Sequence, residues 1–203
     1  MKILFLTNNN ISDPLIQWLE EDKNNDIKVL SDKLTLKTLQ EVNPWITISY
    51  NYKYIIPTEI VECSNKRIIN LHISYLPWNK GSHPNIWSII TNTPSGVSIH
   101  QVDSDIDTGP VLLQKQVLID EPSETIKSSY KKLHNEIQEL FKDNWEQLKN
   151  FKIRPSKQNL KGSMHYVKDL KPYKHIFDLY GYDIPIIKFK KLIREVQNDN
   201  KNQ

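Results

Sequence analysis

The amino-acid sequence predicts an α/β protein with a Rossmann-like, mainly parallel sheet and flanking helices. In its first half, apolar runs typical of buried strands alternate with capped or amphipathic segments typical of helices. Strands separated by helices imply right-handed crossovers, which place successive strands parallel. The 203 residues suffice for one domain of ordinary size and a small appendage. We expect a main domain over residues 1–150 and a C-terminal appendage, a β-hairpin with a helix, over residues 151–203.

The expected strands are short runs rich in Ile, Leu and Val. They cover Lys2–Thr7, Ile27–Leu30, Trp45–Ser49, Ile68–His72, Gly96–Val102 and Val111–Ile119. The expected helices begin at capping residues or prolines, as Ser12-Asp13-Pro14 illustrates. They cover Ser12–Asp22, Leu34–Val42, Thr58–Cys63, Pro84–Thr91, an amphipathic segment from Pro122 to about Lys149, and Ile184–Val196. Strand-like pieces around Gly162, between Phe151 and Asp169, predict the hairpin.

Asn70 and His72 stand two residues apart at the end of an expected buried strand. Side chains alternate between the faces of a strand, so these two point to the same face. In open parallel sheets, ligands bind beyond the carboxyl ends of the strands. There, an amide can orient a carbonyl while a neighbouring imidazole moves a proton. Either residue alone is more often structural, but together they predict an acyl-transfer site.

An acidic loop lies between the last two expected strands and carries Asp103, Asp105 and Asp107 at alternate positions. A calcium-binding EF-hand loop that began at Asp103 would need glycine at its sixth position and glutamate at its twelfth. Thr108 and Gln114 stand at those positions. We therefore expect no metal here, and we interpret the first two aspartates as loop residues.

Composition limits the classes of function. The net charge of +3 is a mild excess that does not indicate nucleic-acid binding. Cys63 is the only cysteine, which excludes an intrachain disulfide and fits a reducing cytoplasm. No run approaches the length of a membrane span, and the apolar start is too short for a signal peptide. We expect a cytoplasmic protein.

Several short motifs follow one another in the chain. They are Asn70-x-His72, Pro77, Lys80-Gly81, Gly96-Val97-Ser98-Ile99-His100 and Asp107-x-Gly109. In this order they resemble the formyltransferases that use 10-formyltetrahydrofolate. The resemblance covers most of residues 1 to about 120, and the ordered combination is specific, although no single piece would be.

This resemblance implies a catalytic trio of Asn70, His72 and Asp107, with 10-formyltetrahydrofolate as the formyl donor and no metal. The Asn70 amide suits the oxyanion, and His72 can combine oxyanion stabilisation with proton transfer. Asp107 can orient His72, stabilise its imidazolium form or relay the proton, and the division of proton transfer between His72 and Asp107 stays open. The resemblance also implies that the pteridine ring lies against the loop before Asp107. The candidate folate-binding residues are Ile86, Val102, Asp103 and Asp105.

The acceptor of the formyl group differs between the branches of the family that this sequence resembles. Methionyl-tRNA formyltransferases carry a further nucleic-acid-binding domain, and formyltetrahydrofolate hydrolases a regulatory one, and we expect neither here. Glycinamide ribonucleotide formyltransferases hold a phosphate on a glycine-rich turn after the first strand, whereas Thr7–Ile11 contains no glycine. That purine-synthesis enzyme remains the alternative, together with a non-catalytic relative that acts as a binding module.

The remaining branch formylates nucleotide-linked amino sugars. Our best interpretation is a dTDP-linked 4-amino-4,6-dideoxyglucose, used in lipopolysaccharide O-antigen or other surface-glycan biosynthesis, with the 3-amino isomer close behind. Lys80 and His83 resemble that branch, as does a tyrosine run that could stack on a pyrimidine or bond a diphosphate. The candidate substrate-binding residues are Tyr50, Tyr52, Tyr54, Lys80 and His83. By the same resemblance, the hairpin expected over Arg154–Asp169 would form the contact of a homodimer.

Overall fold

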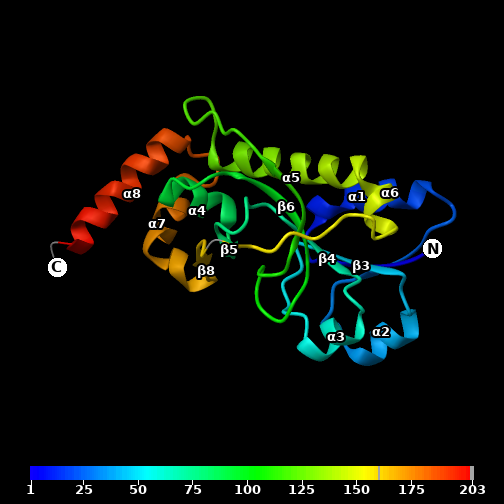
Figure 1. The fold of residues 1–203 in the computed structure, drawn as a ribbon. Helices are drawn as coiled ribbons and strands as arrows, with labels where there is room; N and C mark the ends of the chain where they lie inside the picture. The colour runs from blue at the N-terminus through cyan, green and yellow to red at the C-terminus, as the bar shows by residue number, and fades with distance from the viewer. Residues whose placement is uncertain (160, 202–203) are drawn as a thin grey trace.

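A six-stranded sheet forms the centre of the computed structural model, which describes residues 1–159 and 161–201 (Figure 1). Its strands follow the order β2-β1-β3-β4-β6-β7. They are β1 (Lys2–Leu6), β2 (Asp26–Leu30), β3 (Ile46–Tyr50), β4 (Ile68–His72), β6 (Gly96–Gln101) and β7 (Val111–Gln116). The first four are parallel, whereas β6 is antiparallel to β4 and β7 is antiparallel to β6. The expected α/β, mostly parallel fold is confirmed.

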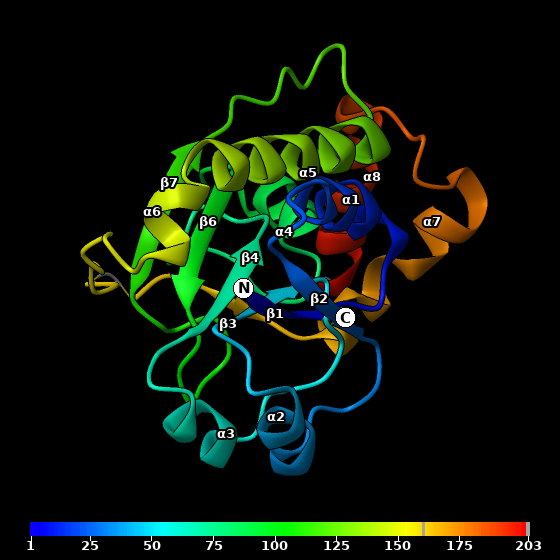
Figure 2. The same cartoon turned by 90° about the vertical axis from the view of Figure 1, so that its right-hand side faces the viewer.

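Helices cover both faces of this sheet: α1 and α5 lie on one side, and α2 and α3 on the other (Figure 2). The helical segments are η1 (Asn10–Ser12), α1 (Asp13–Glu21), α2 (Leu36–Val42), α3 (Thr58–Cys63), α4 (Pro84–Thr91), α5 (Ile126–Asp143), α6 (Trp145–Lys149), η2 (Val167–Tyr173), α7 (Lys174–Tyr180) and α8 (Ile186–Lys201). Within the described residues, no helix is both long and apolar enough to span a membrane.

Strand β1 shows why the sheet is stable in this layered arrangement. Ile3 and Phe5 belong to the hydrophobic cluster that includes α1 and α5. Leu4 and Leu6 face the opposite way and pack with the cluster under α3. All four side chains are fully buried, and each burial contributes roughly 1.5–3 kcal/mol. A central strand buried on both faces therefore has the continuous apolar run seen in the sequence.

The C-terminal segment packs on α4 and forms a second hydrophobic core. Ile86 and Trp87 of α4 lie in this core beside Ile186 and Phe189 of α8. The expectation of a β-hairpin over Arg154–Asp169 is wrong for the described residues. Instead, a two-residue strand β8 (Met164–His165) pairs in parallel with β5 (Lys80–Gly81).

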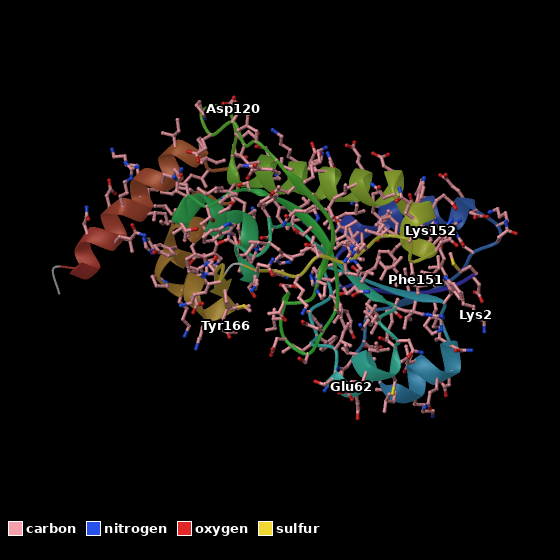
Figure 3. All side chains as sticks on the ribbon, in the orientation of Figure 1. Lys2, Glu62, Asp120, Phe151, Lys152 and Tyr166 are labelled. Carbon is pink, nitrogen blue, oxygen red and sulfur yellow. The ribbon has the colours of Figure 1, made fainter. Side chains whose placement is uncertain are left out.

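The described residues before β8, 151–159 and 161–163, cross the molecule in an extended form rather than folding back on themselves. Phe151 and Tyr166, which the expected hairpin would bring near each other, lie well apart in Figure 3. Without the hairpin, the predicted dimer contact loses its structural basis. Leu160 of this segment and the last two residues of the predicted 151–203 appendage lie outside the described residues.

Two helical predictions also need correction. The helix expected to run to Lys149 stops at Asp143, because the Asn144 side chain donates to the Leu140 carbonyl oxygen, 2.9 Å away, and its backbone leaves helical geometry. Helix α7 was not predicted: its N-terminus has no capping side chain, and the Gly181 that ends it was not read as a stop signal. The final helix was expected over Ile184–Val196 and is confirmed as α8 with shifted ends.

A buried histidine between α5 and the sheet should make the fold sensitive to acid. His134 is 1% exposed, and its Nδ1 accepts a 2.6 Å hydrogen bond from the Tyr50 hydroxyl. Burial lowers the pKa of His134 to about 3. Because this folded-state pKa lies below the unfolded value of about 6.5, the neutral ring stabilises the fold above pH ~6.5. That stability should be lost as the pH falls towards 3, at about 1.4 kcal/mol per pH unit.

We therefore expect His134→Asn, which can still accept from Tyr50, to flatten the decline in stability between pH 6.5 and 4. Urea unfolding at several pH values would measure this slope, with the exposed His175→Asn as the matched control. A decline as steep in His134→Asn as in the wild type would contradict the prediction.

Candidate active site

Asn70, His72 and Asp107 come together at the carboxyl end of β4, as the sequence predicts. Asn70 Nδ2 donates to Asp107 Oδ1 over 3.1 Å, and His72 Nε2 lies 3.6 Å from Asp107 Oδ2. The backbone N–H of Gly81 donates to the same Oδ2 over 2.8 Å. One carboxylate therefore joins a strand side chain, a histidine and the small strand β5.

His100 is a fourth member of the cluster and was missed as a site residue. Its Nε2 lies 3.3 Å from Asp107 Oδ1 and 3.1 Å from Asn70 Nδ2. Its Nδ1 is 2.8 Å from the Gln101 carbonyl oxygen, so Nδ1 carries a proton. Strand pairing is the signal that could have identified His100, because it lies directly opposite Asn70 in the antiparallel β4–β6 register.

The cluster is buried and its charges are set by its neighbours. Burial opposes the ionisation of Asp107, but His72, His100 and the Gly81 N–H together hold the pKa of this carboxyl well below its usual range. Burial lowers the pKa of His72 despite the nearby Asp107, and His72 Nε2 also lies 3.2 Å from the Asn79 carbonyl oxygen. At neutral pH the site therefore holds a carboxylate beside a neutral imidazole that can accept a proton.

The turn that presents Asp107 has unusual backbone geometry. Asp107 itself adopts a left-handed conformation with φ of 53°, which few residues other than Gly, Asn and Asp adopt. Two residues on, a Cβ on Gly109 would lie 1.8 Å from the Gln101 carbonyl oxygen, so only glycine fits. Asp103 Oδ1 accepts from the Thr108 hydroxyl over 2.6 Å and from the Asp105 N–H over 3.3 Å. The motif Asp107-x-Gly109 is thus required by backbone geometry as well as by charge.

The predicted folate-binding residues differ in exposure. The Ile86 side chain is 2% exposed and packs in the second core with α8, so a folate contact at this position would use the backbone. Val102 is half-buried, and Asp103 is occupied in holding the loop. Asp105 is exposed and open to a ligand.

The three tyrosines predicted to bind the substrate also differ in how accessible their side chains are. Tyr50 is wrong as a contact residue, because its side chain is 0% exposed in the core and hydrogen-bonds to His134. The Tyr52 hydroxyl donates to the Asp32 carbonyl oxygen and accepts from the Leu34 N–H, so its ring rather than its hydroxyl is available. Tyr54 is half-buried and packs edge-to-face on Tyr52.

Lys80 and His83 lie on the short stretch that runs from β5 to the start of α4. Lys80 is half-buried in β5, immediately before the Gly81 N–H that holds Asp107. His83 is exposed and takes a left-handed conformation at the start of α4. In the described ranges, no group of three or more His, Cys, Asp or Glu side chains is placed to hold a metal ion.

Comparison with known proteins agrees with this fold. The sequence model described as formyl transferase matches residues 7–144. The crystal structure of the formyltransferase PseJ from Anoxybacillus kamchatkensis is 38% identical, with a TM-score of 0.85 over 93% of this chain and 97% of that one. That structure was solved in complex with UDP-4,6-dideoxy-4-formamido-L-AltNAc and tetrahydrofolate. This chain belongs to the formyl transferase family.

Two curated relatives illustrate the spread within that family. A methionyl-tRNA formyltransferase of Thermodesulfovibrio yellowstonii is 38% identical over 93 residues, which cover 45% of this chain and 30% of the relative. A dTDP-4-amino-4,6-dideoxyglucose formyltransferase of Mycobacterium tuberculosis is 24% identical over 131 residues, 64% of this chain and 55% of the relative. The matches thus span from about a third to about half of the length of these curated relatives.

Proposed function

We propose that this protein transfers the formyl group of 10-formyltetrahydrofolate to the amine of a nucleotide-linked amino-dideoxy sugar. The observation that carries the proposal is the buried cluster of Asn70, His72 and Asp107, joined by the hydrogen bonds described above. The likeness to PseJ, which extends over nearly the whole of both chains, supports a sugar as acceptor.

Each member of the cluster has a distinct chemical role in this proposal. The neutral amine attacks the formyl carbon, and negative charge develops on the formyl oxygen. Asn70 donates one of its two amide N–H groups to this oxygen. In the structure the amide nitrogen lies within hydrogen-bond distance of Asp107 and His100, so one of these two contacts is given up. His72 accepts the proton that the amine must lose, and Asp107 stabilises the resulting imidazolium. The proton then passes to the departing nitrogen of the folate.

We propose that the folate lies along the loop after β6, where Val102 and the exposed Asp105 are accessible to its pteridine ring. The same loop ends at Asp107, whose carboxylate accepts a hydrogen bond from Asn70. A folate bound along the loop would therefore bring its formyl group near Asn70. The acceptor would enter from the carboxyl end of β3, where the rings of Tyr52 and Tyr54 pack together and Lys53 lies over the Tyr54 ring. Lys80 and His83 border the same opening in this proposal.

For the acceptor we propose a 4-amino-4,6-dideoxy sugar, the pattern shared by the PseJ ligand and the mycobacterial relative. The two differ in the carrier nucleotide, which is UDP in the first and dTDP in the second. The dTDP-linked 4-amino-4,6-dideoxyglucose inferred from the sequence stays a candidate. We put the UDP-linked 4-amino-4,6-dideoxy-L-AltNAc first, a choice that the higher identity and coverage of PseJ support.

The test is an assay of the purified protein with 10-formyltetrahydrofolate and one acceptor at a time, with products weighed by mass spectrometry. The acceptors are the UDP-linked amino sugar, the dTDP-linked sugar with its amine at position 4 or 3, glycinamide ribonucleotide, and methionyl-tRNA. We expect a gain of one formyl mass on the UDP-linked sugar. Formylation of glycinamide ribonucleotide or methionyl-tRNA alone, or of nothing, would overturn the proposal.

A further inference from the structure

Residues 156–159 and 161–165 lie beyond the part of the chain that the family model matches, yet they contact the catalytic cluster from two sides. The Gln158 side-chain Nε2 donates to the Asp107 carbonyl oxygen over 2.9 Å and to the Gly109 carbonyl oxygen over 2.8 Å. Both acceptors are carbonyls, so the amide orientation is fixed by its partners. One side chain thus bonds the backbone on both sides of Thr108.

We propose that Gln158 is a positioning residue that holds the Asp107 turn in the geometry needed for formyl transfer. The proposal deepens the function proposed above and rests on it. Gln158 does not touch the cluster's side chains in the described structure, and it acts through the backbone of Asp107.

The Asp107 turn needs such support because several of its requirements must be met together. Asp107 adopts a left-handed conformation, while its carboxylate must face Asn70, His72, His100 and the Gly81 N–H. A small rotation of the turn would move the carboxylate away from one of these partners. Two hydrogen bonds from one amide fix the carbonyls that flank the turn, and thereby limit that rotation.

Gln158 can exert this restraint because its own segment is anchored at both ends. Before it, Ser156 and Val111 exchange two backbone hydrogen bonds of 2.8 Å. After it, β8 pairs with β5, the strand whose Gly81 N–H bonds the Asp107 carboxylate. Ser163 Oγ also accepts from the N–H of Asn79, the residue whose carbonyl oxygen faces His72. The segment therefore links the groups that hold Asp107 with Asn79, whose carbonyl oxygen faces His72.

The test is Gln158→Met, which keeps the size of the side chain but removes both donors. Gln40→Met is the matched control, because Gln40 is exposed on α2. We expect kcat for formyl transfer to fall about 10-fold to 100-fold with KM for the sugar nucleotide nearly unchanged, since misplacement by about 1 Å is enough for such a loss. Gln158→Leu also lacks the donors and adds no charge beside Asp107, so it should behave in the same way and serves if the Met variant does not fold.

A second readout does not depend on activity. The charged and titratable groups that contact His72 are Asp107 and His100, and the Asp107 carboxylate raises the pKa of His72 against the lowering effect of burial. Releasing the turn should therefore make His72 titrate at a lower pH. NMR of the ring resonances, with His72 assigned through the His72→Gln variant, measures this shift in the wild type and in Gln158→Met.

The outcomes separate the two proposals. If the wild type formylates none of the acceptors, the proposed function fails, while the NMR titration still tests the coupling between Gln158 and His72. An unchanged His72 titration in both Gln158 variants would overturn the positioning role. A loss of kcat with unchanged titration and a lower thermal midpoint would overturn it as well, because that pattern indicates only general destabilisation.

Discussion

Replacement of His72 by alanine should lower kcat for formyl transfer by about a thousandfold, within the range measured for general acid–base residues. The ring is 8% exposed and is held between the Asn79 carbonyl oxygen and the Asp107 carboxylate. Burial lowers its pKa, so at neutral pH the ring is neutral and ready to accept the proton of the attacking amine. Alanine cannot accept this proton, and bulk water would have to take its place.

The measurement is kcat with the acceptor identified in the mass-spectrometric assay, together with the thermal midpoint of each variant. His175→Ala is the control, since His175 is exposed on α7 and should keep full activity. Truncation of a buried ring also leaves a cavity, so His72→Gln should be compared to separate loss of chemistry from loss of packing. Activity within tenfold of the wild type in both His72 variants would rule out the proposed proton transfer.

The spacing of Asn70 and His72 was sufficient to predict their common face, because alternation along a strand is a local property of the backbone. Strands β1 to β4 and helices α3 and α4 were likewise readable from apolar runs, caps and prolines. Asp107 was placed in the site by its resemblance to a known motif. Its left-handed backbone and the close approach at Gly109 give that motif its physical reason.

Features that depend on distant parts of the chain were not readable in the same way. His100 joins the cluster only because β6 runs antiparallel to β4, and a local pattern does not reveal strand direction. The two-residue strand β8 is stable only through its pairing with β5, about eighty positions earlier, so its residues suggested a local hairpin instead. Tyr50 resembled a ligand contact by its position at the end of β3, but the packing of α5 buries it.

Changing Asp107 to asparagine should have the second large effect, lowering kcat by about a thousandfold to ten-thousandfold, as loss of a buried carboxylate beside a catalytic histidine does elsewhere. Asparagine keeps the size of the side chain and one acceptor oxygen. It loses the negative charge that would stabilise the His72 imidazolium, and its amide nitrogen must face at least one of the donors on Asn70 and Gly81. Asp143→Asn, at an exposed position at the end of α5, is the matched control.

The stability of the Asp107→Asn variant separates this electrostatic role from a structural one. The folded-state pKa of Asp107 lies below its unfolded value, so the carboxylate stabilises the fold above pH ~4 and this contribution is lost as the pH falls further. Urea unfolding at pH 7 should therefore show a loss of stability in the variant, and the loss should shrink in acid. Because the charge acts on His72 as well, the variant's remaining activity should depend on pH through a His72 of lower pKa. A variant that kept more than about a tenth of the wild-type kcat would show that the carboxylate only orders the turn, since charge stabilisation predicts a far larger loss.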